Sequence, residues 1–229
     1  LRRLVDKAEG EGLDLVSLMV LLRTKSHWER LLIPAFVFFF QKLYPFPRVN
    51  DPQRGEAAAA GGCMLVRRGA LERAGGLAAI RGEVIDDCAL AALLKAGGPI
   101  WLGLTDRVRS LRAYPGLSDI WSMVVRTAFI QLGHSAWALA GTVLAMVLIY
   151  LVPPTAAVFG KTTPGAVFGL LAWGLMAWAY LPTADLYRQP PWRALLLPLA
   201  AFLYTLMTLD SALRHWRGRG GGWKGRNYG

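Results

Sequence analysis

The chain has 229 residues, of which 54% are hydrophobic, and its 26 Lys and Arg residues outnumber its 15 Asp and Glu residues by 11. This hydrophobicity excludes an intrinsically disordered chain, and two cysteines, Cys63 and Cys88, are too few for a small disulfide scaffold. A mean hydropathy of +0.35 is high for a soluble domain and suggests a membrane protein. Because the sequence begins with Leu1 instead of Met, we expect a piece of a longer protein, cut at its N-terminal side.

Charge is distributed unevenly along the chain. Thirteen of the fifteen acidic residues lie at or before Asp119, and only Asp185 and Asp210 follow. The first half therefore has the composition of a soluble domain of mixed charge, whereas the second half consists of apolar segments followed by a basic tail.

The first elements in chain order are a helix end, a strand and an apolar helix. Residues 1–11 resemble the end of a helix, and residues 13–22, rich in Val and Leu, predict a strand. Ser26 and Glu29 have the spacing of a helix start, so we expect a helix over residues 27–43 that ends where proline follows. Its charge-free part is far shorter than the roughly 20 residues of a bilayer span, which favours a buried or interfacial helix.

The next elements alternate between strands and helices. Residues 57–66 predict a strand that leads into a short helix over residues 69–74, and two adjacent aspartates open a helix over residues 88–96. Residues 99–104 and 107–113 predict two short strands. This order indicates an α/β sheet whose first strands are missing.

The composition changes from residue 117 onward. Residues 119–132 predict an amphipathic helix, and three apolar segments that approach the length of a bilayer span follow over residues 136–152, 164–181 and 194–209. The alternative is that these are buried helices of a large soluble core. A chain of this length cannot cover three helices that are apolar on all sides, so the membrane interpretation is favoured.

Two pairs of residues in the first half have the pattern of a catalytic site. Gly61 and Gly62 stand beside a predicted strand, where glycine permits the close approach of a ligand. Asp86 and Asp87 stand at a helix start, where backbone N–H groups and the helix dipole hold a carboxylate ionised and rigidly aimed. Such a carboxylate suits a general base. The alternative is that Asp86 is only the N-cap and Asp87 a favourable first-turn charge.

The stretches that contain these pairs resemble a known family. They read GGCMLVRR and, after a loop, IDDCALAALLKAGG, and this order is similar to the second half of family 2 glycosyltransferases, which are inverting enzymes with a GT-A fold. The stretches LRRLV, LIPAFVFFFQKLYPF and WKGRNY extend the likeness to hopanoid-biosynthesis-associated membrane glycosyltransferases. The resemblance implies that Asp87 is the general base, that Asp86 is its supporting acid, and that Gly61 and Gly62 border the bound substrates. Ile85 replaces the Thr of the fuller family signature.

The resemblance also implies a part that this chain lacks. The nucleotide-binding half of the family, with the D-x-D motif that ligates Mg²⁺ or Mn²⁺, would lie upstream of Leu1. No D-x-D motif occurs in this sequence. We therefore expect the full-length enzyme to use Mg²⁺ or Mn²⁺, and this fragment alone to bind no metal and to be inactive.

Two further sites follow from the same resemblance. Processive members carry a Q-x-x-R-W motif, of which only Arg126 is present here, with Met123 and Thr127 in place of Gln and Trp. This favours a single transfer, with Arg126 either pairing with the donor diphosphate or reaching lipid headgroups. Lys224 and Arg226 in the basic tail either fold back to the donor site or contact anionic lipids, at about 1 kcal/mol per charge. Anionic lipids are a better partner for this juxtamembrane tail than nucleic acid.

Together these observations predict a fold class, an organisation and a function. We expect a partial GT-A-like α/β domain over residues 1–116, an interfacial helix over 117–135, transmembrane helices over 136–210 and a basic juxtamembrane tail over 211–229. The expected activity is the inverting, non-processive transfer of a sugar from a nucleotide-sugar to a lipid acceptor, with a hopanoid as the candidate. The alternative is a non-catalytic membrane protein that organises lipids or a partner through its basic tail and interfacial helix.

The expected location contains a conflict. The resemblance implies a multi-pass protein of the bacterial inner membrane with its catalytic part in the cytoplasm. A cytoplasmic catalytic part and a cytoplasmic basic tail require an even number of crossings, but the sequence contains three apolar segments. One segment is re-entrant, a span is split, or the tail lies outside, and the sequence leaves these alternatives open.

Overall fold

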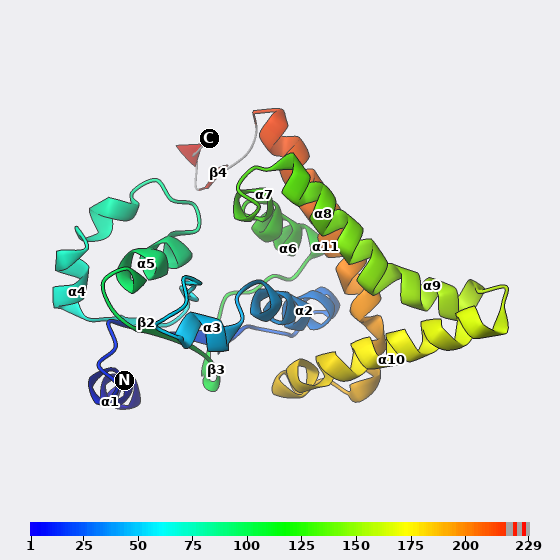
Figure 1. Cartoon of the computed structure of the whole chain (residues 1–229), viewed down its shortest axis with the longest axis horizontal. Coiled ribbons are helices and arrows are strands. Elements are labelled where there is room, and N and C mark those ends of the chain that lie inside the picture. The colour runs from blue at the N-terminus through cyan, green and yellow to red at the C-terminus, as the bar shows by residue number, and fades with distance from the viewer. Residues whose placement is uncertain (219–221, 224–225, 228–229) are drawn as a thin grey trace. The chain divides into compact units, whose positions relative to one another are not determined.

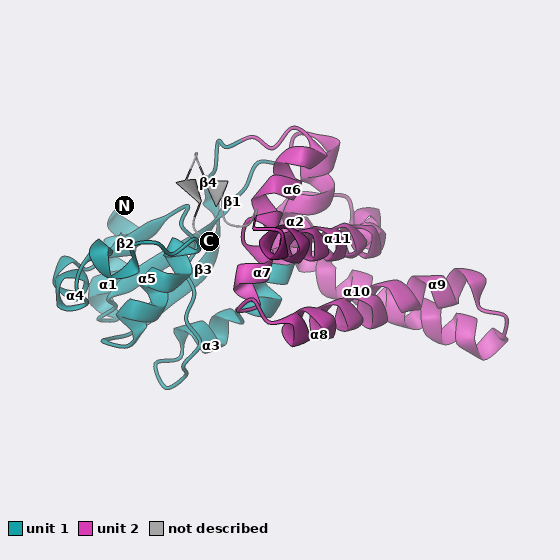
Figure 2. Cartoon of the chain, turned by 90° about the horizontal axis from the view of Figure 1, so that it is seen from above, with its two compact units in different colours: residues 1–23, 39–112 teal, residues 24–38, 113–229 magenta. Residues whose placement is uncertain are grey.

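The computed structural model describes residues 1–218, 222–223 and 226–227 and has a mixed α/β fold that is mostly helical (Figure 1). The chain divides into two compact units (Figure 2). Unit 1 comprises Leu1–Arg23 and Phe39–Arg112, and unit 2 comprises Thr24–Phe38 and Ala113–Gly229.

A three-stranded sheet forms the centre of unit 1. Strand β1 (Leu15–Leu21) lies in the middle, antiparallel to β2 (Met64–Val66) and parallel to β3 (Ile100–Arg109). Leu15, nearly fully buried, lies opposite Val66 on one side and Ile100 on the other. Strand β1 is buried along most of its length, as expected of an apolar strand that is covered on both faces.

The structure confirms one strand prediction and corrects two others. The strand expected over residues 13–22 is β1. Of the strand expected over residues 57–66 only Met64–Val66 forms, and residues 58–60 before it are irregular but buried. The two strands expected over residues 99–104 and 107–113 are the single strand β3, which continues through a register shift in its pairing with β1. Residues 105–108 lie between the pairs Met19–Leu104 and Leu21–Arg109, so an irregularity in the pairing stands where two separate strands were predicted.

Five short helices surround the sheet in unit 1. Helix α5, predicted from its helix-forming residues, packs beside the sheet with its apolar side chains buried. Helix α3 was not predicted, and its last residue, Asn50, bonds to both backbone groups of Leu102 in β3, at 2.7 and 3.0 Å. The helices are α1 (Arg2–Gly10), α3 (Phe46–Asn50), α4 (Arg68–Arg73), the 3-10 helix η1 (Leu77–Ile80) and α5 (Asp86–Lys95).

Helix α2 (His27–Leu43) begins in unit 2 and has the predicted bounds. Its start is a reciprocal capping box, in which the Ser26 hydroxyl accepts from Glu29 N at 3.1 Å and the Glu29 carboxylate accepts from Ser26 N at 2.9 Å. Glu29 is fully buried and also accepts a hydrogen bond from Tyr114 N at 2.7 Å. One carboxylate therefore holds the start of α2 and the segment that leads back into unit 2.

The amphipathic helix expected over residues 119–132 is interrupted. It consists of α6 (Leu117–Val125) and α7 (Ala128–Gln131), which have nine and four residues and are too short to cross a bilayer. A serine hydroxyl explains the break, because Ser211 accepts a hydrogen bond from Phe129 N and donates one to Val125 O. These are the two groups that an unbroken helix would join directly, so the hydroxyl is inserted into the helical hydrogen bond.

Three long helical segments complete unit 2 and confirm the predicted apolar stretches. Ala136–Phe159, Thr163–Leu186 and Pro191–Trp216 have 24, 24 and 26 residues and are apolar enough to cross a membrane. The chain is therefore a membrane protein. The segments contain α8 (Ala136–Met146), the π-helical turn η2 (Val147–Leu151), α9 (Val152–Phe159), α10 (Thr163–Leu186), the 3-10 helix η3 (Pro191–Leu196) and α11 (Leu197–Trp216).

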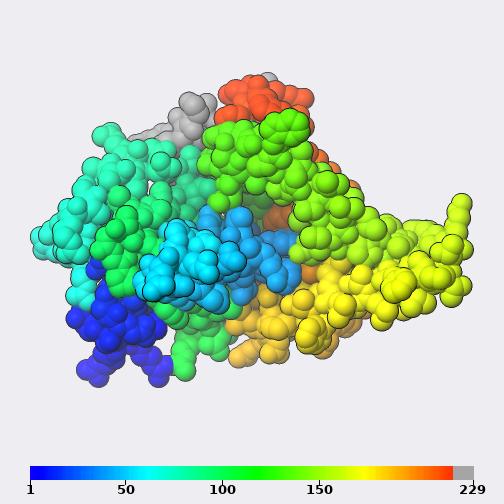
Figure 3. All heavy atoms as spheres, viewed as in Figure 1, coloured from blue at the N-terminus to red at the C-terminus, as the bar shows by residue number. Residues whose placement is uncertain are grey.

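Helices α9 and α10 form a tight antiparallel hairpin. A Cβ atom on Gly169 of α10 would lie 2.6 Å from the backbone nitrogen of Ala157 and 2.8 Å from the carbonyl oxygen of Pro153, so only glycine allows this approach. The hairpin extends away from the other helices of unit 2 (Figure 3). Its exposed residues include the large apolar side chains of Phe159, Phe168 and Leu175. This is the surface expected of helices in contact with lipid.

Candidate functional site

The two aspartates of the predicted site are the first two residues of α5. The N-cap is Ile85, so the interpretation of Asp86 as the N-cap is wrong, and both aspartates are first-turn charges. Their negative charge at this end of the helix is stabilised by the helix dipole.

The Asp87 carboxylate is fixed by two backbone amides. Its Oδ2 accepts a hydrogen bond from Gly61 N and its Oδ1 accepts one from Cys88 N, each at 2.8 Å. Burial raises the pKa of this half-buried carboxyl above its ordinary value, although the two backbone hydrogen bonds oppose the shift. The neighbouring Asp86 charge raises this pKa further. The carboxylate is thus positioned from two elements and holds a proton more readily than an exposed aspartate.

Asp86 has a different environment from its neighbour. It is exposed, and its Oδ1 accepts a hydrogen bond from Asp87 N at 3.0 Å. This bond satisfies a backbone amide at the start of α5 that has no partner within the helix. Asp86 thus supports the backbone that carries Asp87.

The paired glycines are each approached by a side chain of this chain. A Cβ atom on Gly61 would lie 3.2 Å from Asp87 Oδ2, and a Cβ atom on Gly62 would lie 2.8 Å from a methyl carbon of Val20 in β1. Gly61 therefore makes room for the Asp87 carboxylate, and Gly62 lets the loop lie against the buried strand. The approach of a ligand to these glycines stays a prediction.

The two cysteines are free and unpaired with each other. The Cys88 thiol donates a hydrogen bond to the carbonyl oxygen of Ala59 at 3.6 Å, and burial raises its pKa to about 11. A thiol with this pKa stays protonated at neutral pH and is a poor nucleophile. Nucleophilic chemistry at the start of α5 is therefore not expected from Cys88.

The other predicted site residues lie outside unit 1. Arg126 is half-buried in unit 2, at the break between α6 and α7. Arg226 belongs to β5 (Arg226–Asn227), whose backbone pairs with β4 (Gly222–Trp223), but its side chain and the whole of Lys224 lie outside the described residues. The interpretation of these three as donor ligands stays a prediction.

A metal ion in a protein is usually held by several His, Cys, Asp or Glu side chains. Among the described residues, no group of three or more such side chains could hold one. That the ligands of Mg²⁺ or Mn²⁺ lie upstream of Leu1, as the resemblance implies, stays a prediction.

Comparison with known proteins adds no identification, because no family model, curated protein or solved structure matches the chain.

The ends of the helical region lie side by side within unit 2. The imidazoles of His134, before α8, and His215, near the end of α11, are stacked with their centroids 4.1 Å apart. Phe129 of α7, Leu139 of α8 and Ala212 of α11 form one buried cluster. The start of Ala136–Phe159 is thus beside the end of Pro191–Trp216.

The three apolar segments differ in how far protein covers them. In the most apolar 18-residue stretch of each, 6% is buried for Ala136–Phe159, 17% for Thr163–Leu186 and 44% for Pro191–Trp216. The last segment also carries Asp210, which accepts hydrogen bonds from the indole of Trp121 at 2.7 Å and from Arg214 at 3.0 Å. Polar contacts of this kind are expensive in lipid and are found where protein or water surrounds a helix.

Proposed function

We propose that this chain is the acceptor-side part of a membrane glycosyltransferase that transfers a sugar from a nucleotide-sugar to a lipid with inversion. The observation that carries this proposal is the Asp87 carboxylate, which the amides of Gly61 and Cys88 hold at the start of α5. Its raised pKa supports the role, because a general base is most effective when its pKa lies close to the working pH.

The proposed reaction is a single displacement. Asp87 takes the proton of an acceptor hydroxyl while that oxygen attacks the anomeric carbon of the donor. The bond from this carbon to the diphosphate oxygen breaks, and the electron pair leaves with the nucleoside diphosphate. Attack opposite the leaving group inverts the anomeric configuration. Asp86 keeps the Asp87 backbone in place, and Arg126, Lys224 and Arg226 are candidates to pair with the diphosphate.

A screen of the full-length enzyme tests this proposal. Purified protein would be incubated with Mg²⁺ or Mn²⁺, a panel of nucleotide-sugars and a lipid extract that contains hopanoids. The expected product is a glycolipid whose anomeric configuration, read by NMR, is opposite to that of the donor. Retention of configuration would rule out the single displacement. Absence of transfer from every donor would favour the non-catalytic alternative, a protein that organises lipids or a partner.

We also propose that the chain crosses the bacterial inner membrane twice. The stacking of His134 on His215 supports an even number, because three crossings would separate the start of Ala136–Phe159 from the end of Pro191–Trp216. The two crossings would be Ala136–Phe159 and Thr163–Leu186, the least buried segments, each about 36 Å long at 1.5 Å per residue. This length exceeds the roughly 30 Å of the hydrocarbon core.

In this arrangement the third segment stays on the side from which the first one enters. The loop at the far side, residues 160–162, carries a single charge, Lys161. The near side carries four described arginines around the third segment, which are Arg188, Arg193, Arg214 and Arg217. An excess of basic residues marks the cytoplasmic side, so the positive-inside rule supports a cytoplasmic Asp87 and tail.

A further inference from the structure

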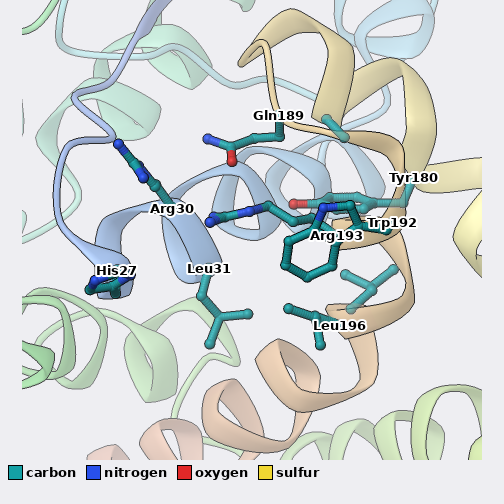
Figure 4. A pocket seen from close by; sticks show the side chains of 10 residues that line it. His27, Arg30, Leu31, Tyr180, Gln189, Trp192, Arg193 and Leu196 are labelled. Carbon is teal, nitrogen blue, oxygen red and sulfur yellow. The ribbon is translucent and has the colours of Figure 1, made fainter.

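Unit 2 contains a cavity that the proposed transfer reaction does not use. Its volume is about 250 Å³, and it lies among the first turns of α2, the end of α10 and η3 (Figure 4). Figure 4 shows Arg193 extending from η3 toward α2, the helix that carries His27 and Arg30. The polar and aromatic side chains that line it are His27, Arg30, Tyr180, Gln189, Trp192 and Arg193.

Arg193 has a buried hydrogen-bond donor that is unsatisfied among the described residues. Its Nε atom is buried and, among the residues that the structure describes, has no hydrogen-bond partner. Its guanidinium carbon lies 5.4 Å from the ring centroid of Trp192, which holds the cation at the cavity wall. A buried donor without a partner costs free energy, so an acceptor bound in this cavity would be favoured.

The charge and size of the cavity indicate which kind of ligand it can bind. Arg193 and Arg30 are cationic, and the lining includes no acidic side chain. The planar guanidinium matches phosphate oxygens, which it binds by paired, charge-assisted hydrogen bonds. The volume is below the roughly 300–1,000 Å³ of sites for drug-sized ligands, so it suits one phosphate group and its ester arm better than a nucleotide-sugar.

The position of the cavity indicates that this phosphate belongs to a membrane lipid. The cavity lies where one apolar segment, Thr163–Leu186, ends and the next, Pro191–Trp216, begins. In the proposed two-crossing arrangement Thr163–Leu186 leaves the hydrocarbon core at this point, which places the cavity at the level of lipid headgroups. Arg188 has a φ of +52°, a left-handed turn that ends α10 and directs the chain to Gln189 in the lining. The rest of the wall is apolar, with Leu31, Leu196 and Leu197 among its residues.

We infer that this cavity binds the phosphate of an anionic membrane phospholipid, held by Arg193 and Arg30, with the acyl chains against exposed apolar side chains of α10. This inference does not rest on the role of Asp87.

Calorimetric titration of the full chain in detergent would test this site. Dioctanoyl phosphatidylglycerol is the probe, and Arg193→Gln is expected to weaken its binding by about tenfold or more, because a charge-assisted pair of hydrogen bonds is lost. Arg30→Gln is expected to act in the same direction. The matched control is Arg188→Gln, which changes an exposed arginine of the same loop that does not line the cavity.

The outcomes separate the lipid from other sources of binding. Equal affinity of the parent and both lining variants would overturn the site. Equal binding of dioctanoyl phosphatidylcholine would show that the site does not distinguish an anionic lipid from a zwitterionic one. Equal binding of inorganic phosphate would assign the site to a soluble compound. If Arg193→Gln fails to fold, Arg30→Gln decides the result, because this arginine is exposed on α2.

Discussion

Asp87→Asn is the substitution that separates a catalytic carboxylate from a structural one. Both carboxylate oxygens of Asp87 accept a backbone hydrogen bond, from Gly61 N and Cys88 N, each at 2.8 Å. Asparagine has the same size but only one side-chain oxygen, so one of these amides would face an NH₂ group. An unsatisfied donor costs roughly 1–3 kcal/mol when it is buried, and the loss here is at the lower end because Gly61 is exposed and Cys88 is half-buried. Each kcal/mol corresponds to about 2–4 °C of melting temperature in a chain of this length.

A second effect opposes this loss of stability. Burial raises the pKa of Asp87, so the ionised carboxylate costs free energy in the folded state at neutral pH, and the neutral amide removes that cost. We therefore expect a loss of stability below about 3 kcal/mol. Turnover should fall by far more, on the order of 10²–10⁴-fold, because the proton acceptor is gone. Donor affinity should be nearly unchanged.

The assay uses the full-length enzyme at a temperature well below the melting temperature of every variant. Release of nucleoside diphosphate measures turnover, calorimetry measures donor affinity, and thermal unfolding measures stability. The matched control is Asp86→Asn, which changes an exposed carboxylate that accepts a hydrogen bond from Asp87 N, so its turnover should fall less. Comparable turnover of the parent and folded Asp87→Asn would refute the assignment of Asp87 as the base.

Three further predictions follow from the same structure. Turnover should rise with pH through the raised pKa of Asp87, because the base must be ionised. The contribution of Asp87 to stability should fall over the same pH range, because the folded state holds this proton to higher pH than the unfolded chain. A pH profile of turnover and of melting temperature tests both effects. Gly62→Ala should destabilise the chain by roughly 1–3 kcal/mol, because its Cβ would lie 2.8 Å from a Val20 methyl, and adding Val20→Ala should make the total loss smaller than the sum of the two single losses. In intact cells, an impermeant maleimide should label Lys161→Cys but label Arg188→Cys only after permeabilisation; labelling of both without permeabilisation would contradict two crossings.

The sequence predicted best those elements whose signals are local. The bounds of α2 were predicted because Ser26 and Glu29 form a capping box and prolines follow the helix end. The start of α5 was predicted because acidic residues precede a run of helix formers. Each of these signals lies within a few residues of the element that it delimits.

Other features could not be predicted, because residues far apart in the chain determine them. The break between α6 and α7 depends on Ser211, 82 residues beyond Phe129. The requirement for glycine at position 62 depends on contact with Val20 in the neighbouring strand. The cavity in unit 2 joins Arg30 to Arg193, and no spacing in the sequence relates them. Each of these features depends on tertiary packing, and local sequence patterns carry no information about it.

The buried carboxylate of Glu29 is synthesised well before one of its hydrogen-bond partners. Its partner Tyr114 lies 85 residues later, so at about 5–20 residues per second the ribosome delivers it roughly 4–17 s after Glu29. Tyr204, whose hydroxyl donates a hydrogen bond to Leu32 O in the same helix, is synthesised later still. During this interval the Glu29 carboxylate accepts hydrogen bonds from the nearby amides of Lys25 and Ser26 but not from Tyr114 N, and the later helices that pack on α2 are not yet made. The final environment of α2 therefore forms only after Tyr204 has been synthesised.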